Sequence, residues 1–382
     1  MSKYDKVTLV ILGLILTAII ILFPVFILDN ITYPIPNFKP TSPGSQNKSA
    51  MNTPSVSING PAQGVFTKYN TVESPPDISW NRFGVVLDLG RSGESDSQNI
   101  ESPLVVKLNE SSYVLFYRGQ TYKDKVGRIM RAVSTDGKNW NKTGVVMEPE
   151  FSYEGNKIDP MAVIFEDGIF KMWYSGTAYG GCACYATSSD GMTWAKHSGN
   201  PVLRKTSGYW DNEGAGGQLS IIKVGNIYRM YYKGYGSAKS GWTFYGLAES
   251  NDGTTWMKKG VVISPQPELG ETTTFKNLFA FQTGESCYLM HTMANYLDLF
   301  LLQSNDCQVS WLKKGVIFRH GLTPGGWDIK WATSPFLIKD GNTLKMWYEG
   351  GDSNGRVRTL YAEIEADLFF KVARNTAIDA GN

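Results

Sequence analysis

The sequence predicts an all-β fold, a five-bladed β-propeller whose last blade is completed by the N-terminal strand. Three observations predict it: a repeated phrase that ends in Trp, a repeated aromatic strand that ends in Gly, and one Trp phrase out of order near residue 80. No helical periodicity competes with the strand pattern after residue 76.

The first repeated phrase is S-x-D-G-x-x-W. It reads STDGKNW to Trp140, SSDGMTW to Trp194, SNDGTTW to Trp256 and, in a loosened form, SNDCQVSW to Trp311. Asp-Gly is a strong signal for a short turn between antiparallel strands, so each phrase predicts a turn that leads into a Trp-bearing strand. The phrase returns every 55 to 60 residues or so, a period typical of repeat folds.

The second repeated phrase is an aromatic strand. It reads YVLFYRG to Gly119, FKMWYSG to Gly176, YRMYYKG to Gly234 and LKMWYEG to Gly350, and CYLMHTM near Cys287 is a degenerate copy. An apolar strand precedes it, as in PLVVKL, PMAVIF, LSIIKV and SPFLIK. Each unit is therefore a four-stranded antiparallel meander. A meander this small cannot bury both of its faces, so the copies are expected to stack radially.

The order of the phrases gives the number of blades. The last aromatic strand ends at Gly350 and is followed by one more strand but no Trp phrase, whereas Trp80 and Gly84 stand alone before the first unit. We infer that the N-terminal strand supplies the missing outer strand of the last blade, which leaves no open sheet edge. Five aromatic strands and five Trp strands make five blades. A linear β-solenoid does not explain the position of Trp80.

The chain begins with a candidate membrane anchor, residues 1–28. An uncharged run starts at Val7 and ends at Leu28, and about 22 helical residues at about 1.5 Å each would span roughly 33 Å, enough to cross a bilayer. A cleavable signal peptide is the alternative, but no A-x-A-like site follows the run. Lys3 and Lys6 precede it, so we expect a single-pass protein with a cytoplasmic N-terminus and an extracytoplasmic propeller.

Composition sets the remaining boundaries. Residues 29–75 are rich in Pro, Ser and Asn and predict a flexible stalk, residues 76–372 form the propeller, and residues 373–382 form a tail. The net charge of +2 gives no support for nucleic-acid binding. The three histidines are scattered and no Cys/His spacing resembles a metal site, so no cofactor is expected, with a structural Ca²⁺ or Na⁺ ion in the channel left open.

The four cysteines fit an oxidising compartment. Cys287 opens one strand and Cys307 follows the return of the next, so a disulfide between them and two buried free thiols are about equally supported. Cys182 and Cys184 alternate on one face of a strand and are poorly placed to bond each other.

Acidic residues precede the inner strands of three successive blades. They are Glu101, Asp159, and in the third blade Asp211 and Glu213. Carboxylates that converge on one funnel raise one another's pKa and are suited to acid/base chemistry at a glycosidic bond. The alternative is that each acidic residue only caps the turn before its strand.

At these residues the chain resembles the five-bladed propeller glycosidases, broadly glycoside hydrolase families 43, 32, 62, 68 and 130. The segment KIDPMAVIFEDGIFKMWYSG is similar to the second-blade segment of family 43, and NEGAGGQLSIIKVGNIYRMYYKG is similar to the third-blade segment that carries the general acid. The resemblance implies that Asp159 tunes the acid and that Glu213 donates the proton, with Asp211 as the alternative donor. The family's first-blade Asp, the base or nucleophile, is replaced by Glu101.

Other residues near the inner strands are candidates for substrate binding. Trp210 and Trp327 could stack on a sugar or pack within their loops. Arg118 could reach substrate hydroxyls or phosphate, although a place on a blade face is the alternative that we favour. The remaining candidates are Asp211, Asp328, Lys276 and Lys330. We therefore expect a membrane-anchored, extracytoplasmic glycoside hydrolase-like protein that acts on a glycan. The alternatives are a non-catalytic carbohydrate-binding or adhesion propeller, and a glycoside phosphorylase whose phosphate would bind Lys276 and Lys330.

Overall fold

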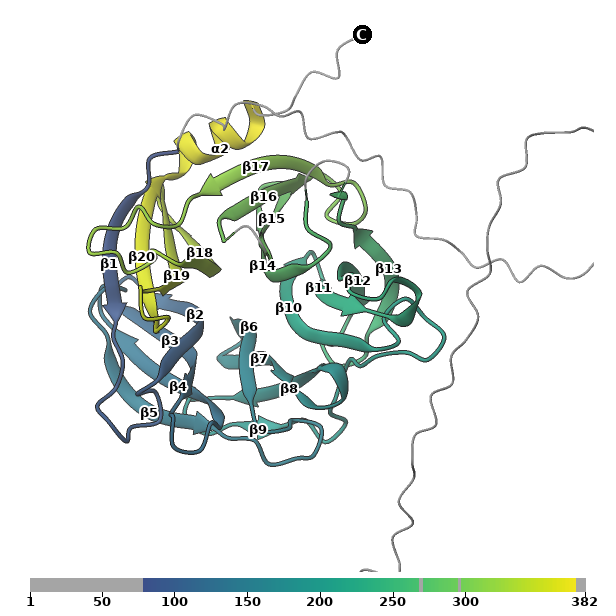
Figure 1. The fold of residues 1–382 in the computed structure, drawn as a ribbon, viewed down its shortest axis with the longest axis horizontal. Helices are drawn as coiled ribbons and strands as arrows, with labels where there is room; N and C mark the ends of the chain where they lie inside the picture. Colours follow the sequence, from purple (N-terminus) through teal and green to yellow (C-terminus); the bar gives the residue numbers. More distant parts are fainter. Residues whose placement is uncertain (1–77, 268–270, 295–296, 376–382) are drawn as a thin grey trace, which may run out of the picture. The chain divides into compact units, whose positions relative to one another are not determined.

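The computed structural model describes residues 78–267, 271–294 and 297–375, which form five antiparallel sheets of four strands around a central axis (Figure 1). Blade 1 contains β2 (Asn99–Asn109), β3 (Ser112–Gln120), β4 (Gly127–Ser134) and β5 (Asn141–Met147). Blade 2 contains β6 (Ile158–Glu166), β7 (Ile169–Gly176), β8 (Cys182–Ser188) and β9 (Ala195–Lys196). Blade 3 contains β10 (Gly214–Val224), β11 (Ile227–Tyr235), β12 (Phe244–Ser250) and β13 (Met257–Ile263).

Blades 4 and 5 complete the circle. Blade 4 contains β14 (Phe275–Thr283), β15 (Ser286–Met293), β16 (Leu299–Ser304) and β17 (Leu312–Phe318). Blade 5 contains β18 (Trp331–Asp340), β19 (Thr343–Gly351), β20 (Val357–Glu365) and, from the other end of the chain, β1 (Asn81–Leu87). Two short 3-10 helices, η1 (Ala178–Gly180) and η2 (Ser237–Lys239), follow the second strands of blades 2 and 3.

The N-terminal strand closes the propeller, as the position of its Trp phrase predicts. β1 pairs antiparallel with β20, from Asn81 opposite Glu363 to Leu87 opposite Thr359. Trp80 is buried, its ring meets Phe318 edge to face at 5.7 Å, and its Nε1 donates a hydrogen bond to the carbonyl of Ile317 at 3.1 Å. The first strand therefore joins the blade of the last one (Figure 1), and the five-bladed prediction is confirmed.

The repeated S-x-D-G-x-x-W phrase forms the turn between the third and fourth strands. In blade 1, Ser134 Oγ donates to Asp136 at 2.9 Å, and Asp136 Oδ1 accepts the backbone N–H groups of Lys138 and Asn139 at 2.8 Å each. Trp140 Nε1 donates to the carbonyl of Gly137 at 3.1 Å. The same bonds recur around Asp190, Asp252 and Asp306. The phrase thus reports the fold.

Neighbouring blades pack face to face. Val106 and Phe116 of blade 1 share a core with Phe170 and Met172 of blade 2, and the rings of Phe116 and Phe170 meet edge to face at 5.7 Å. Each sheet buries its apolar faces against its neighbours because it cannot bury them alone.

The C-terminus departs from the all-β expectation. Helix α2 (Ala366–Asn375) follows β20 directly, where the sequence analysis expected no helix and ended the propeller at residue 372. Phe369 and Phe370 are buried, and Phe369 meets the ring of Trp80 edge to face at 6.0 Å. The helix was missed because ten residues give too few turns for a clear helical period.

The cysteines follow one of the two alternatives. Cys287 and Cys307 form a disulfide with 5.3 Å between their Cα atoms, whereas Cys182 and Cys184 are free and buried. The predicted anchor (residues 1–28), the stalk (29–75) and most of the tail lie outside the described residues. Within the described part of the chain, no helix is long and apolar enough to cross a membrane.

Candidate functional site

The five inner strands β2, β6, β10, β14 and β18 surround the central axis (Figure 1). Each contains a break in its pairing register near its start, for example between Glu101 and Leu104 in β2 and between Pro160 and Ala162 in β6. Such bulges re-aim side chains and are common next to functional sites. Glu101 lies opposite Arg118, immediately before the break in β2. Asp159 occupies the equivalent position in β6, where it lies opposite Ser175.

Glu101, Arg118 and Asp159 form what we call the carboxylate–arginine cluster. The Arg118 guanidinium makes ion pairs with Glu101 of its own blade and with Asp159 of the next blade. The three side chains are 19%, 14% and 7% exposed, so these charges are only weakly screened by solvent. Two sequence-predicted carboxylates are therefore brought together from different blades, with a predicted arginine between them.

Residues of blade 5 hold this cluster in place through hydrogen bonds. The buried Glu349 accepts hydrogen bonds from the backbone N–H of Ser102 at 2.6 Å and from Thr333 Oγ1 at 2.9 Å. Ser102 has a φ of 55°, a left-handed conformation that is strained for a serine, and its Oγ donates to Asp159 at 3.4 Å. Burial raises the pKa of the Glu349 carboxyl. Glu349 therefore holds the backbone beside Glu101 in place.

Glu349 belongs to a set of equivalent positions, of which the sequence analysis named only Arg118. The residue before the terminal Gly of each aromatic strand lies opposite the start of the inner strand of its own blade, and in blade 4 Met293 takes the place of the Gly. Two members of the set, Arg118 and Glu349, also contact the next blade. The set is Arg118, Ser175, Lys233, Thr292 and Glu349. Aligning the five aromatic strands column by column would have shown a polar or charged residue at this position in every repeat.

Glu213 lies apart from the cluster. It is exposed, and its backbone N–H donates to the carbonyl of Tyr235 at 3.2 Å. The N–H groups of Gln98 and Lys330 make the same bond in blades 1 and 5, so Glu213 and Lys330 are in register with Gln98, three positions before Glu101. Three residues of strand correspond to about 10 Å.

In blade 1, Glu101 follows Ile100, which lies opposite the terminal Gly119 of the aromatic strand. In blade 3, Gly216 follows Ala215, which lies opposite the equivalent Gly234. Gly216 therefore takes the position in blade 3 that Glu101 takes in blade 1. In blade 4 the same position holds Lys276, which follows Phe275. The structure therefore does not place a third inner-strand carboxylate at this level in blade 3.

Asp211 and Asp328 are correctly predicted to precede inner strands, but the structure places them inside their blades and not on the axis. Asp211 is fully buried, pairs with Lys258 at 2.5 Å and accepts a hydrogen bond from Tyr232 Oη at 3.2 Å. Asp328 is also fully buried and pairs with Arg82 at 3.1 Å. These partners leave neither carboxylate any surface to offer a sugar.

This arrangement repeats as a blade ion pair in every blade. A buried acidic residue before the inner strand pairs with the basic residue two positions after the Trp of the outer strand. The pairs are Asp96–Lys142, Glu154–Lys196, Asp211–Lys258, Glu271–Lys313 and Asp328–Arg82. The sequence signal that would have found them is W-x-K/R, which recurs five times.

The two candidate stacking tryptophans pack within their loops. The Trp210 ring stacks on Tyr232 with 5.5 Å between centroids, and a Cβ on Gly234 would lie 2.4 Å from Trp210. The Arg358 guanidinium lies 4.9 Å from the Trp327 ring centroid. Of the two alternatives given by the sequence, the structure shows loop packing for both.

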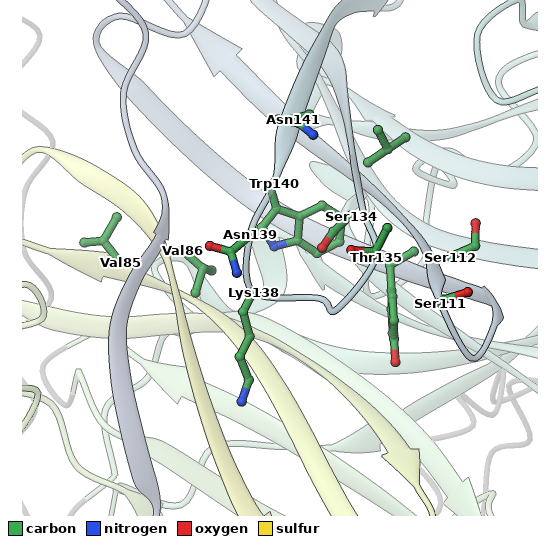
Figure 2. Close-up of a pocket in the computed structure, with 12 residues that line it drawn as sticks. Val85, Val86, Ser111, Ser112, Ser134, Thr135, Lys138, Asn139, Trp140 and Asn141 are labelled. Atoms are coloured by element: carbon green, nitrogen blue, oxygen red, sulfur yellow. The ribbon is translucent and has the colours of Figure 1, made fainter.

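A pocket lies at the outer edge, between β1 and blade 1 (Figure 2). Val85 and Val86 line one side of it, and Lys138, Asn139 and Trp140 line the other. Its lining residues contain no carboxylate, so it lacks the pair of carboxyl groups that glycoside hydrolysis uses. Within the described residues, no group of three or more His, Cys, Asp or Glu side chains could hold a metal ion.

Comparison with known proteins adds to this picture. Residues 99–214 match the model of the glycosyl hydrolases family 32 N-terminal domain. No curated protein sequence matches the chain. These matched residues contain Glu101, Arg118, Asp159 and Glu213.

Solved structures share the fold at low identity. A β-1,2-mannobiose phosphorylase from Listeria innocua superposes with a TM-score of 0.61 at 12% identity, covering 78% of this chain and 99% of that one. A family 117 glycoside hydrolase from Zobellia galactanivorans gives 0.57 at 15% identity, covering 78% and 92%. A Bombyx mori family 32 β-fructofuranosidase gives 0.54 at 13% identity, covering 75% and 62%.

Proposed function

We propose that this chain, a five-bladed β-propeller of the superfamily that includes glycoside hydrolase families 32, 43 and 130, cleaves glycosidic bonds of a glycan at its carboxylate–arginine cluster. One observation carries the proposal. Glu101 and Asp159 extend from the inner strands of neighbouring blades and share the Arg118 guanidinium.

The chemistry follows from what these groups can do. Glycoside hydrolysis uses one carboxylate as base or nucleophile and a second carboxyl group that protonates the leaving oxygen. In the proposal Glu101 is the base or nucleophile, and Asp159, fixed by Arg118 and Ser102, positions the sugar and tunes the acid. Glu213 is the proposed proton donor and would act from the rim, where it is exposed.

Turnover of a glycan panel tests the proposal. Glu101→Gln and Asp159→Asn should each lower turnover by about 10²-fold or more, the usual effect of losing a group that takes part in acid/base catalysis. Glu213→Gln should lower turnover of substrates with poor leaving groups most. The control is Glu110→Gln, since the Glu110 side chain is 91% exposed and remote from the cluster in its blade. Equal turnover by wild type and Glu101→Gln would end the proposal.

A second candidate function is glycan binding without cleavage. It is favoured by Gly216, which stands where blade 3 would otherwise present a carboxylate beside the cluster. The two candidates separate in one measurement. Binding of a glycan that weakens in Arg118→Met, with no product from wild type over long incubation, would support the binding protein and contradict the hydrolase.

We also propose that the run from Val7 to Leu28 anchors the propeller on the outer face of a membrane. Its length and lack of charge support this, and the Cys287–Cys307 disulfide fits an oxidising compartment. Carbonate extraction of membranes from cells that express the full chain, followed by protease treatment of intact cells, tests it. Recovery in the soluble fraction, or a protected propeller in intact cells, would contradict the proposal.

A further inference from the structure

Lys233 is a half-buried cation on β11, the second strand of blade 3, opposite the start of inner strand β10. Its position on β11 is equivalent to that of Arg118 in blade 1 and of Glu349 in blade 5. Both of those residues contact the next blade around the axis. Within the part of the chain that the structure describes, the Lys233 ammonium group forms neither an ion pair nor a hydrogen bond. By contrast, Arg118 in the same register is held by two carboxylates.

A second lysine lies beside it. Lys276 follows Phe275 on β14, the inner strand of the next blade, and it too has no ion pair within the described part of the chain. Burial, together with the positive charge of Lys276, lowers the pKa of Lys233 to about 8. Two like charges, one of them partly removed from water, destabilise each other unless an anion lies between them.

The charges around the axis are divided by blade. Glu101, Asp159 and Glu349 come from blades 1, 2 and 5, and the Arg118 cation of blade 1 is already paired with two of them. Lys233 and Lys276, in contrast, come from blades 3 and 4. A neutral sugar would leave the two ammonium groups without a partner. A ligand with an anionic group at one end would pair with them and would be held in one orientation relative to the carboxylate–arginine cluster.

We propose that Lys233 and Lys276 bind an anionic oxygen group, a carboxylate, sulfate or phosphate, and thereby select an acidic glycan. The selection of a glycan rests on the proposed function, but the anion site itself does not. The anionic group has two sources, a substituent on the substrate or free inorganic phosphate. The second source would imply cleavage by phosphate in place of water.

Lysine side-chain NMR on the full chain tests the site without requiring turnover. The protein is labelled with [13Cε]lysine, and the signals of Lys233 and Lys276 are assigned by their loss in Lys233→Arg and Lys276→Arg. Sodium glucuronate, inorganic phosphate and glucose are then titrated separately. We expect saturable shifts of both signals with an anion and none with glucose, together with a rise in the pKa of Lys233 as the anion binds.

The variants sharpen the assignment. Lys276→Gln should weaken anion binding at Lys233 about tenfold, the scale of one charge-assisted hydrogen bond. Lys339→Gln, at the exposed far end of inner strand β18, should leave it unchanged. Shifts with glucuronate but not phosphate assign the site to a substrate substituent, and shifts with phosphate alone assign it to free phosphate. No shift with either anion overturns the proposal, whatever the glycan panel shows.

Discussion

The Arg118 guanidinium lies between two carboxylates from neighbouring blades, and all three side chains are largely shielded from solvent. Removing one partner of such a group leaves uncompensated charge in a weakly screened place. Arg118→Met should lower the free energy of unfolding by about 2–4 kcal/mol in urea denaturation at pH 7.

Arg128→Met is the matched control for this variant. Arg128 pairs with Asp124 and Glu148, whose side chains are exposed, so its loss should cost under about 1 kcal/mol. Equal losses in the two variants would show that the cluster is not the desolvated site that its geometry indicates.

His291 gives a second prediction, for acid stability. Its two ring nitrogens are buried without hydrogen-bond partners, and burial, with the nearby Lys313 charge, lowers its pKa to about 3. The unfolded chain, with a histidine pKa of about 6.5, binds one more proton between these values. Stability should therefore fall as pH falls through this window, by about 1.4 kcal/mol per pH unit. His291→Phe should remove that slope, and an unchanged slope in urea denaturation across pH 4–7 would refute it.

Within each blade, the blade ion pair fastens the outer strand to the loop before the inner strand. Lys258 on β13 pairs with the fully buried Asp211, whereas its neighbour Lys259 pairs with Glu249 at the surface. Lys258→Met should lower the free energy of unfolding by about 3 kcal/mol, because it leaves a buried carboxylate unpaired. Lys259→Met should cost under about 1 kcal/mol. Adding Asp211→Asn to Lys258→Met should recover part of the loss, and the absence of any recovery would contradict the coupling.

The strands of each blade could be predicted because local signals specify them. Asp-Gly turns and aromatic strands recur in sequence, so blade number and closure by Trp80 followed from their order. Helix α2 and the blade ion pairs could not be predicted in this way. The helix is short, and W-x-K/R marks only the basic residue of each pair, whose acidic partner approaches it only after the meander has folded. The site was predictable in part. Glu101 and Asp159 meet as expected, whereas their shared pairing with Arg118 was not foreseen. Glu213 was expected to join them, but it precedes β10, where Gly216 takes the equivalent position and a bulge places Gly216, Gly217 and Gln218 opposite Lys233.

At the scale of the whole molecule, closure depends on a strand that arrives from the far end of the chain. Trp80 precedes that strand and packs against Phe318 of blade 4 and Phe369 of α2. Trp80→Ala should lower the free energy of unfolding by about 3–5 kcal/mol, the usual cost of deleting a buried large aromatic side chain. Trp242→Ala, in a surface loop where the ring stacks on Phe244, should cost much less. Similar costs would indicate that closure by β1 contributes little to stability.

The central claim, that a glycan is processed at the carboxylate–arginine cluster, is tested most directly by where a glycan binds. The measurement is a crystal structure of Asp159→Asn soaked with the best substrate from the glycan panel. We expect a sugar ring on the central axis, within hydrogen-bond distance of Arg118 and Glu101. A sugar bound only in the outer pocket beside Trp140 and Lys138 (Figure 2), with the axis empty, would contradict it.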